Sequence, residues 1–166
     1  MPAARAIATP AALARLGTWH RLGERQLEAL RDPLDPGLAE AALRYFDLTE
    51  SQHHRDEEDD LLPALIESMA GSDPVCLREL AAAAITAHRA IESAWRALRP
   101  QVLAVARGEP AVLSASAVDA LAERCRASFA LEDREILPMA ARLLDHPTLQ
   151  DLARRFDARR AAPIRR

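Results

Sequence analysis

The chain contains an internal repeat, and both copies of the repeat carry histidines and acidic residues. Residues 18–24 return 68 positions later as residues 86–92, and the two segments share the pattern Thr-x-His-Arg-x-x-Glu. A second segment, residues 53–63, returns 75 positions later as residues 128–138, and each copy places a glutamate six residues before a proline. Two similar halves predict a pseudo-two-fold axis, with equivalent residues facing each other across the interior. A stacked array of helical repeats is less well supported, because two copies are fewer than the roughly three that such arrays need.

The composition favours helices over strands. Hydrophobic residues make up 49% of the chain but aromatic residues only 4%, and alanine, leucine, arginine and glutamate dominate. These residues form helices readily, whereas valine and isoleucine, which favour strands, are sparse. A chain of 166 residues is long enough to bury a core as one domain. The predicted fold class is therefore all-α, in a single domain over 1–166 with its core at about 10–145.

Turn signals divide the chain into four long amphipathic segments and a short C-terminal one. These segments lie at about 10–31, 38–69, 73–100, 114–144 and 148–159. The first and third open with a capping residue and a proline, at Thr9–Pro10 and Asp73–Pro74. Pro100 is expected to end or kink the third helix, because it cannot donate a backbone hydrogen bond. Four such helices with short connections predict an antiparallel up-down four-helix bundle.

The short C-terminal helix carries three large apolar residues, Leu149, Leu152 and Phe156. They either cap the bundle or form a dimer contact, and we favour the cap.

Two histidines lie on apolar seams of predicted helices. His20 falls on a stripe of leucines, and His88 falls on a regular seam with spacing that alternates between four and three. One histidine on an apolar face is more often a hydrogen-bonded core residue than a metal ligand. Because both halves of the repeat keep their histidine, we favour metal ligands for the pair.

The second helix offers two overlapping His-x-x-x-Glu pairs. His53 with Glu57 and His54 with Glu58 each lie four residues apart, so either pair could chelate one ion. The internal alignment places Glu57 opposite Glu132 in the fourth helix, and this favours His53 and Glu57 pointing inward with His54 and Glu58 toward the rim. The alternative is that acidic residues 56–60 simply form a solvated face.

Pro63 and Pro138 follow the two aligned glutamates at the same distance. A proline inside a regular helix costs on the order of 3 kcal/mol. The shared placement suggests a kink below the site in both helices; the alternative is that each proline ends its helix.

Three imidazoles and two carboxylates therefore form the candidate metal site. The ligand set is His20, His53, Glu57, His88 and Glu132. Nitrogen and oxygen donors without thiolate suit iron, manganese or zinc. Carboxylates from facing helices can bridge two ions, although the order and spacing differ from the Glu-x-x-His motif of ferritin-like bundles.

These residues resemble the hemerythrin-like, HHE cation-binding family. The pattern of that family is a lone histidine in the first and third helices and His-x-x-x-Glu in the second and fourth, each acidic motif preceding a Leu-Phe-Pro or Leu-Leu-Pro sequence. The resemblance covers about 10–145 and implies a four-helix bundle with a non-heme di-iron centre and carboxylate bridges. It also implies binding or sensing of dioxygen, nitric oxide or iron, or the handling of peroxide.

The chain departs from this pattern at Ser128, which stands where the family has the fourth-helix histidine. Three outcomes are open: an asymmetric di-iron site, a mononuclear site on the first half, or a degenerate bundle without metal. Cys125, Asp133 and Glu135 are alternative donors near this position.

The leading hypothesis is a protein that binds non-heme iron, with zinc or manganese as other candidates. Its rivals are a metal-free bundle that acts as an interaction module, and an oxidase or peroxidase-type enzyme, for which we find no substrate-pocket signature. A net charge of −3 gives no reason to expect nucleic acid or an anionic membrane as partner. We expect a cytoplasmic monomer or homodimer, because the two cysteines lie far apart and no apolar run has the length of a signal peptide or membrane span.

Overall fold

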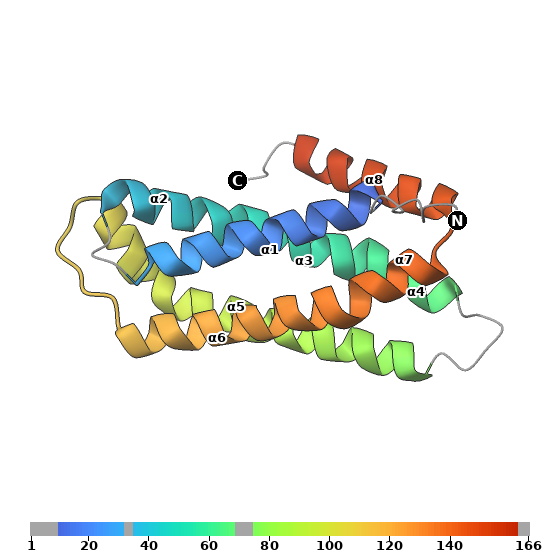
Figure 1. Ribbon diagram of the computed structural model, residues 1–166. Helices are drawn as coiled ribbons and strands as arrows, with labels where there is room; N and C mark the ends of the chain where they lie inside the picture. Colours follow the sequence, from blue (N-terminus) through green and yellow to red (C-terminus); the bar gives the residue numbers. More distant parts are fainter. Residues whose placement is uncertain (1–9, 32–34, 69–74, 163–166) are drawn as a thin grey trace, which may run out of the picture.

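Four helical rods run antiparallel to one another, and a shorter helix lies along their outside (Figure 1). This computed structural model describes residues 10–31, 35–68 and 75–162. The first rod is α1 (Ala11–Ala29) and the third is α5 (Val75–Ala106). The second rod is continuous through α2 (Pro36–Arg44), η1 (Tyr45–Glu50), α3 (Ser51–Asp56), η2 (Glu57–Leu61) and α4 (Leu62–Ser68). The fourth rod comprises α6 (Ala115–Leu131), η3 (Glu132–Ile136) and α7 (Leu137–Leu143), and α8 (His146–Ala161) follows it.

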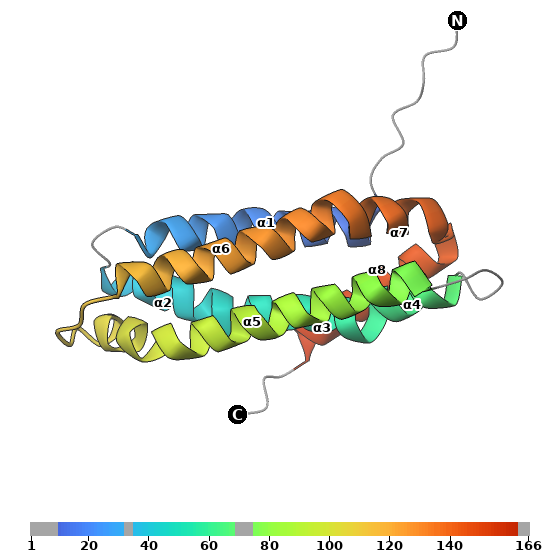
Figure 2. The ribbon, with the colours of Figure 1, turned by 90° about the horizontal axis from the view of Figure 1, so that it is seen from below.

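The all-α prediction is confirmed, since the described residues contain helices and no strand. The first and third rods each pack against the second and the fourth, so the halves of the repeat occupy equivalent places. Seen from below, α6 runs alongside both α1 and α5 (Figure 2). Within the described residues, no helix is both long and apolar enough to cross a membrane.

Several helix ends follow the expected capping chemistry. The Asp35 side chain accepts a hydrogen bond from the Leu38 N–H at the start of the second rod, and the Ser114 side chain caps α6. Pro10 occupies the cap position of α1 rather than its first turn. Thr9 and the pair Asp73–Pro74 lie outside the described residues.

One of the two outcomes expected of Pro100, that it ends the third helix, was wrong. Helix α5 does not end at Pro100 but continues to Ala106, because the exposed ring lies on the solvent side of the helix. Pro147 follows the break between α7 and α8 and lies in the first turn of α8, where its missing N–H has no helical partner to lose.

Wide π-helical turns begin at both aligned glutamates. The Leu62 N–H reaches back five residues to the Glu57 carbonyl, and the Leu137 N–H reaches back five residues to the Glu132 carbonyl. Such turns interrupt the regular ladder of i→i−4 hydrogen bonds. Pro63 and Pro138 follow these turns and do not end their helices.

The wide turns keep a stripe spaced by four residues on one face. In a regular helix, residues four apart drift by about 40° at each step, so such a stripe would rotate out of the core. The buried stripes are His53, Glu57, Leu61 and Leu65 in the second rod, and Ser128, Glu132, Ile136 and Ala140 in the fourth. A π-helical turn contains more residues than an α-helical turn, so it cancels this rotation of the stripe around the helix axis. Both glutamates therefore remain inside the bundle.

Two apolar cores lie on either side of a polar layer. One core includes Leu27, Leu98 and Leu121, and the other includes Leu16, Leu61 and Ile136. Between them lie the buried polar side chains of His20, Glu50, His53, His54, Glu57, His88, Ser128 and Glu132. Burying so many polar groups is costly unless they bond to one another or to a ligand.

Helix α8 covers the side of the bundle along α1 and the second rod (Figure 1). Leu149, Leu152 and Phe156 are buried in the same apolar core as Leu13 and Leu16 of α1. The expected cap is thus confirmed for these three residues, although the helix covers the side of the bundle rather than its end.

Candidate metal centre

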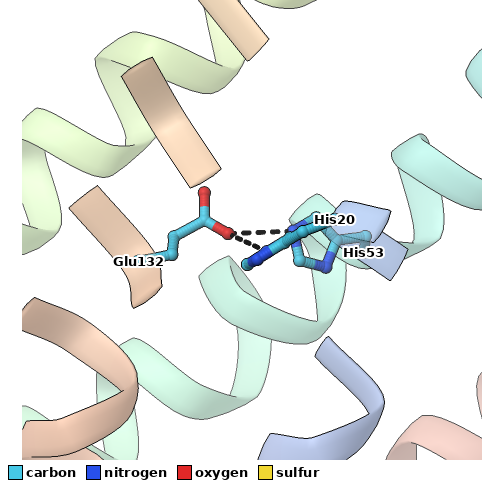
Figure 3. A group of neighbouring side chains, drawn as sticks. All are labelled: His20, His53 and Glu132. Carbon is cyan, nitrogen blue, oxygen red and sulfur yellow. Dashed lines mark hydrogen bonds and ion pairs between the residues drawn. The ribbon is translucent and has the colours of Figure 1, made fainter. Parts of the chain in front are cut away.

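The first group of convergent side chains joins three rods. His20 from α1, His53 from α3 and Glu132 from η3 are each at most 4% exposed. Both imidazoles point at the same carboxylate oxygen (Figure 3): Glu132 Oε2 lies 2.6 Å from His20 Nε2 and 3.1 Å from His53 Nε2. These three donor atoms lie close enough together to hold one metal ion.

The second group shares Glu132 with the first. His88 Nε2 from α5 lies 3.1 Å from Glu57 Oε2 and 3.7 Å from Glu132 Oε1. The donor atoms of Glu57, His88 and Glu132 could hold a second ion. Ser128 does not replace the missing imidazole here; its hydroxyl donates a 2.8 Å hydrogen bond to Glu132 Oε1.

Each lone histidine has a second carboxylate behind it. His20 Nδ1 lies 2.9 Å from Asp133, and His88 Nδ1 lies 2.8 Å from Glu58. A carboxylate at Nδ1 fixes the imidazole tautomer and orientation, and leaves the Nε2 lone pair free for a metal. The sequence aligned Asp133 with Glu58 but did not reveal this role, which depends on the distance between neighbouring rods.

His54 is buried, contrary to the expected place at the rim. Its ring is 3% exposed and stacks on the ring of His88, with centroids 4.0 Å apart. Glu50 lies 3.5 Å from one ring nitrogen and Glu92 lies 3.4 Å from the other. The stacking on His88 and the contact with Glu92 hold the imidazole between α3 and α5. Glu58 is at the rim as expected, and contacts Arg89.

The run of acidic residues 56–60 is only partly a solvated face. Asp59 is exposed, whereas Asp56 and Asp60 are buried against arginines of α8. Arg159 contacts both aspartates, so the acidic run also anchors the C-terminal helix.

The alternative donors near Ser128 do not join either group of candidate ligands within the described residues. Cys125 is buried, and burial together with the charge of Glu50 raises its thiol pKa well above its usual value, which keeps the sulfur protonated. Glu135 is exposed, and Asp133 faces His20 Nδ1 instead.

The charges in the cluster are strongly coupled. Burial lowers the pKa of His53 and His88, but the charge of Glu57 and contacts with Glu132 outweigh burial and raise these pKa values to about 9 and about 10. The pKa of His20 is also raised, because its contact with Glu132 outweighs burial. Conversely, the three imidazoles hold the pKa of Glu132 well below its usual range despite burial. Burial, and then the charge of Glu132, raise the pKa of Glu57.

Several donor atoms at the centre of the cluster lack hydrogen bonds. Within the described residues, His20 Nε2, His88 Nε2 and both carboxylate oxygens of Glu57 are buried and make no contact with hydrogen-bond geometry. The two imidazole nitrogens make ion-pair contacts with Glu132 and Glu57 instead. Buried polar atoms without hydrogen bonds are rare in folded proteins. A cation would use these lone pairs, and the mixed nitrogen and oxygen set suits a divalent transition metal. The residues present therefore fit a metal centre.

The comparisons with known proteins agree with this geometry. The model of a protein family described as "Hemerythrin HHE cation binding domain" matches residues 12–140, which include all the candidate ligands and exclude α8. No curated protein and no solved structure is similar enough to the chain to count as a match.

Proposed function

Because the chain belongs to the hemerythrin HHE cation-binding domain family, we propose that it binds non-heme iron through five side chains. These are His20, His53, Glu57, His88 and Glu132. The observation that supports this most strongly is that Glu132 takes part in both convergent groups, one oxygen facing His20 and His53 and the other facing His88. A carboxylate in this position suits a bridge between two ions.

We propose that the two halves of the centre are unequal. The first ion would have His20, His53 and Glu132, whereas the second would have His88, Glu57 and Glu132, with Ser128 in place of an imidazole. Each ion would have three protein ligands, but the first would have two imidazoles and the second only one. Three protein ligands leave coordination positions open for a small molecule such as dioxygen or nitric oxide. Bound iron would supply reversible binding of such ligands and one-electron redox chemistry.

The chain's own residues would prepare this centre. Asp133 and Glu58 orient His20 and His88 by holding the Nδ1 protons, and the Ser128 hydroxyl fixes one Glu132 oxygen. The two apolar cores exclude water from both ends of the polar layer. We propose binding or sensing of a small ligand or of iron, rather than turnover of an organic substrate. We also propose a cytoplasmic location, because both cysteines are free thiols.

Metal analysis of protein purified without chelator tests the proposal. We expect iron at about two ions per chain for the asymmetric di-iron site, or about one if only the half with two imidazoles is filled. Near-ultraviolet absorption that changes when dioxygen or nitric oxide is added would place the open coordination position on iron. A protein that takes up no iron, zinc or manganese, even after reconstitution, would contradict the proposal and favour the metal-free interaction module.

A further inference from the structure

The single tyrosine of the chain lies beside the metal centre and bonds to a buried carboxylate. Tyr45 and Glu50 are 3% and 2% exposed, and the phenolic hydroxyl donates its proton to Glu50 Oε2 across 2.6 Å. The backbone oxygen of Trp19 lies further from the hydroxyl, at 3.2 Å. A short hydrogen bond to an ionised carboxylate is about twice as strong as a neutral one.

The backbone is shaped around this pair. Tyr45 and Glu50 are the first and last residues of the π-helical turn η1, and such a turn places residues five apart closer to one face than a regular helix does. Gly23 of α1 provides the space: a Cβ atom there would lie 2.4 Å from the Tyr45 hydroxyl oxygen. Any larger residue at position 23 would displace the phenol.

Glu50 is an anion although it is buried. Burial raises its pKa, but the contact with His54, the charge of His54 and the charge of His53 outweigh burial and hold the pKa below its usual value. A core tyrosine that needed only packing would be satisfied by a neutral acceptor, and burying a carboxylate for this purpose is energetically costly. The pairing with an anion places a base on the phenolic proton.

Two chains of contacts link this pair to the proposed ligands. The first chain of contacts runs through Phe129. Its ring stacks on the ring of His20 with centroids 4.7 Å apart, and the Phe129 and Tyr45 rings both lie against Gly23. Through Glu50, the route passes to His54 at 3.5 Å and then to the stacked ring of His88. Tyr45 is therefore within short electron-transfer range of the centre.

We propose that Tyr45 is a redox-active residue that gives up one electron while its proton passes to Glu50. The O–H bond of Tyr45 breaks and an O–H bond forms on Glu50 Oε2, which leaves a neutral tyrosyl radical and a neutral carboxylic acid. A phenol that loses an electron becomes a very strong acid, so a base on its proton is what makes the oxidation accessible.

The oxidant rests on the proposed function: it is hydrogen peroxide reacting at bound ferrous iron. One peroxide molecule takes one electron from Tyr45 and one from a ferrous ion, accepts two protons from solvent and becomes two water molecules. The phenolic proton stays on Glu50, so charge and atoms balance.

The test uses the full chain loaded with ferrous iron, mixed with hydrogen peroxide and frozen rapidly for electron paramagnetic resonance. We expect a tyrosyl signal whose hyperfine pattern collapses when the protein contains ring-deuterated tyrosine, a label specific for Tyr45 because no other tyrosine exists.

Tyr45→Phe should abolish the signal. Glu50→Gln, which keeps an acceptor but cannot take the proton as readily, should slow radical formation by on the order of a hundredfold. Trp95→Phe, which removes an oxidisable ring outside the pair, should leave the early signal unchanged.

A second arm separates this inference from the proposed function. The metal-free full chain is oxidised by a flash-generated ruthenium polypyridyl complex, a one-electron oxidant that needs no iron. Suppose that the ruthenium experiment gives a Tyr45 radical that depends on Glu50, but the iron experiment gives none. This result would support proton transfer from Tyr45 to Glu50 and would refute the iron centre as the oxidant. Iron content and thermal unfolding of Tyr45→Phe and Glu50→Gln should match those of the parent. The absence of a Tyr45 radical in both arms, or equal yields in Glu50→Gln and the parent, would overturn the inference.

Discussion

At the scale of single residues, Glu132 is the side chain on which both metal positions depend. Its two oxygens face different histidines, whereas Glu57 takes part only in the second group. Glu132→Gln should therefore remove metal from both positions, while Glu57→Gln should remove it from the second alone. Metal content by mass spectrometry after desalting measures the difference. Glu135→Gln, an exposed change in the same turn, is the matched control and should leave the metal content unchanged. Equal losses in the Glu57 and Glu132 variants would contradict the shared role of Glu132.

The missing imidazole can be restored at position 128. Ser128→His adds a nitrogen donor beside Glu132 and His88, so we expect the second ion to bind more tightly and the iron content to rise toward about two per chain. The site is packed, with Ser128 1% exposed, so the larger ring should also cost about 1–3 kcal/mol of unfolding free energy. Ser128→Ala is the control, because it also removes the hydrogen bond to Glu132 but adds no ligand. If both variants bind the same amount of iron as the parent, the position does not face the second ion.

The raised histidine pKa values predict that metal and protons compete. In the metal-free protein at neutral pH, His53 and His88 hold protons, since their pKa values lie at about 9 and about 10. Metal binding must release these protons, so affinity should rise with pH until about pH 10. Calorimetry at pH 7 in two buffers of different ionisation enthalpy measures the release directly. A binding enthalpy that is independent of the buffer would show that the histidines are already neutral.

The same pKa values set the pH dependence of the metal-free fold. A group whose pKa is raised on folding stabilises the fold fully below its unfolded pKa, which is 6.5 for histidine, and this contribution is lost as pH rises through the folded pKa. We therefore expect the unfolding free energy of metal-free protein to fall between pH 7 and about pH 10. Urea unfolding at a series of pH values measures this trend, and bound metal should weaken it. A stability that increases over this range would contradict the assigned charges.

At the scale of elements, the wide turns explain a pattern that is visible in the sequence. The buried stripe of the second rod, from His53 through Glu57 to Leu65, keeps four-residue spacing longer than a regular helix can hold on one face. The repeat predicted which glutamates face inward, and burial agrees. The repeat did not predict the π-helical turns. The same residues are also compatible with a regular helix, in which the stripe rotates out of the core until a proline ends the helix.

Pro100 and Pro63 should differ in how much each lowers the unfolding free energy. Pro100 lies inside the regular helix α5, so Pro100→Ala restores a backbone hydrogen bond and should stabilise the protein by about 1–3 kcal/mol. Pro63 follows the wide turn η2, where the ladder is already interrupted, so Pro63→Ala should stabilise it much less and should weaken metal binding by loosening the turn at Glu57. Chemical denaturation compares the two variants. If Pro63→Ala raised the unfolding free energy as much as Pro100→Ala and left the metal affinity unchanged, Pro63 would have no role in shaping the turn at Glu57.

At the scale of the whole molecule, much of the architecture could be predicted from the repeat and the seams. Periodicity placed His20 and His88 on inward faces, and the alignment paired Glu57 with Glu132; all four are buried at the same level of the bundle. The contacts between rods could not be predicted, because side-chain spacing along one helix says nothing about its neighbour. For this reason the burial of His54 against α5 came from the structure alone.

Helix α8, which lies outside the family match, is held to the bundle by buried charges as well as by Phe156. Arg159 is 16% exposed and contacts Asp56 and Asp60, of which Asp56 is fully buried and directly precedes Glu57. Asp56 also pairs with Arg160, and Asp60 also pairs with Arg155, so Arg159→Ala leaves each aspartate with one arginine. Losing the charged contacts of Arg159 should lower the unfolding free energy by about 1–3 kcal/mol. It should also weaken metal binding, because Asp56 loses a contact that fixes the turn at Glu57.

Arg154 provides the matched control for this prediction. It lies on the same helix but is 70% exposed, and among the residues that the structure describes it pairs only with Asp151 of its own helix. Arg154→Ala should therefore cost less than about 0.5 kcal/mol. Urea denaturation of both variants, with metal content measured in parallel, compares a buried anchor with an exposed pair. Similar small losses in both variants would mean that the apolar face of α8 holds the helix without its arginines. A large loss confined to Arg159→Ala, accompanied by weaker metal binding, would make α8 a supporting part of the metal centre.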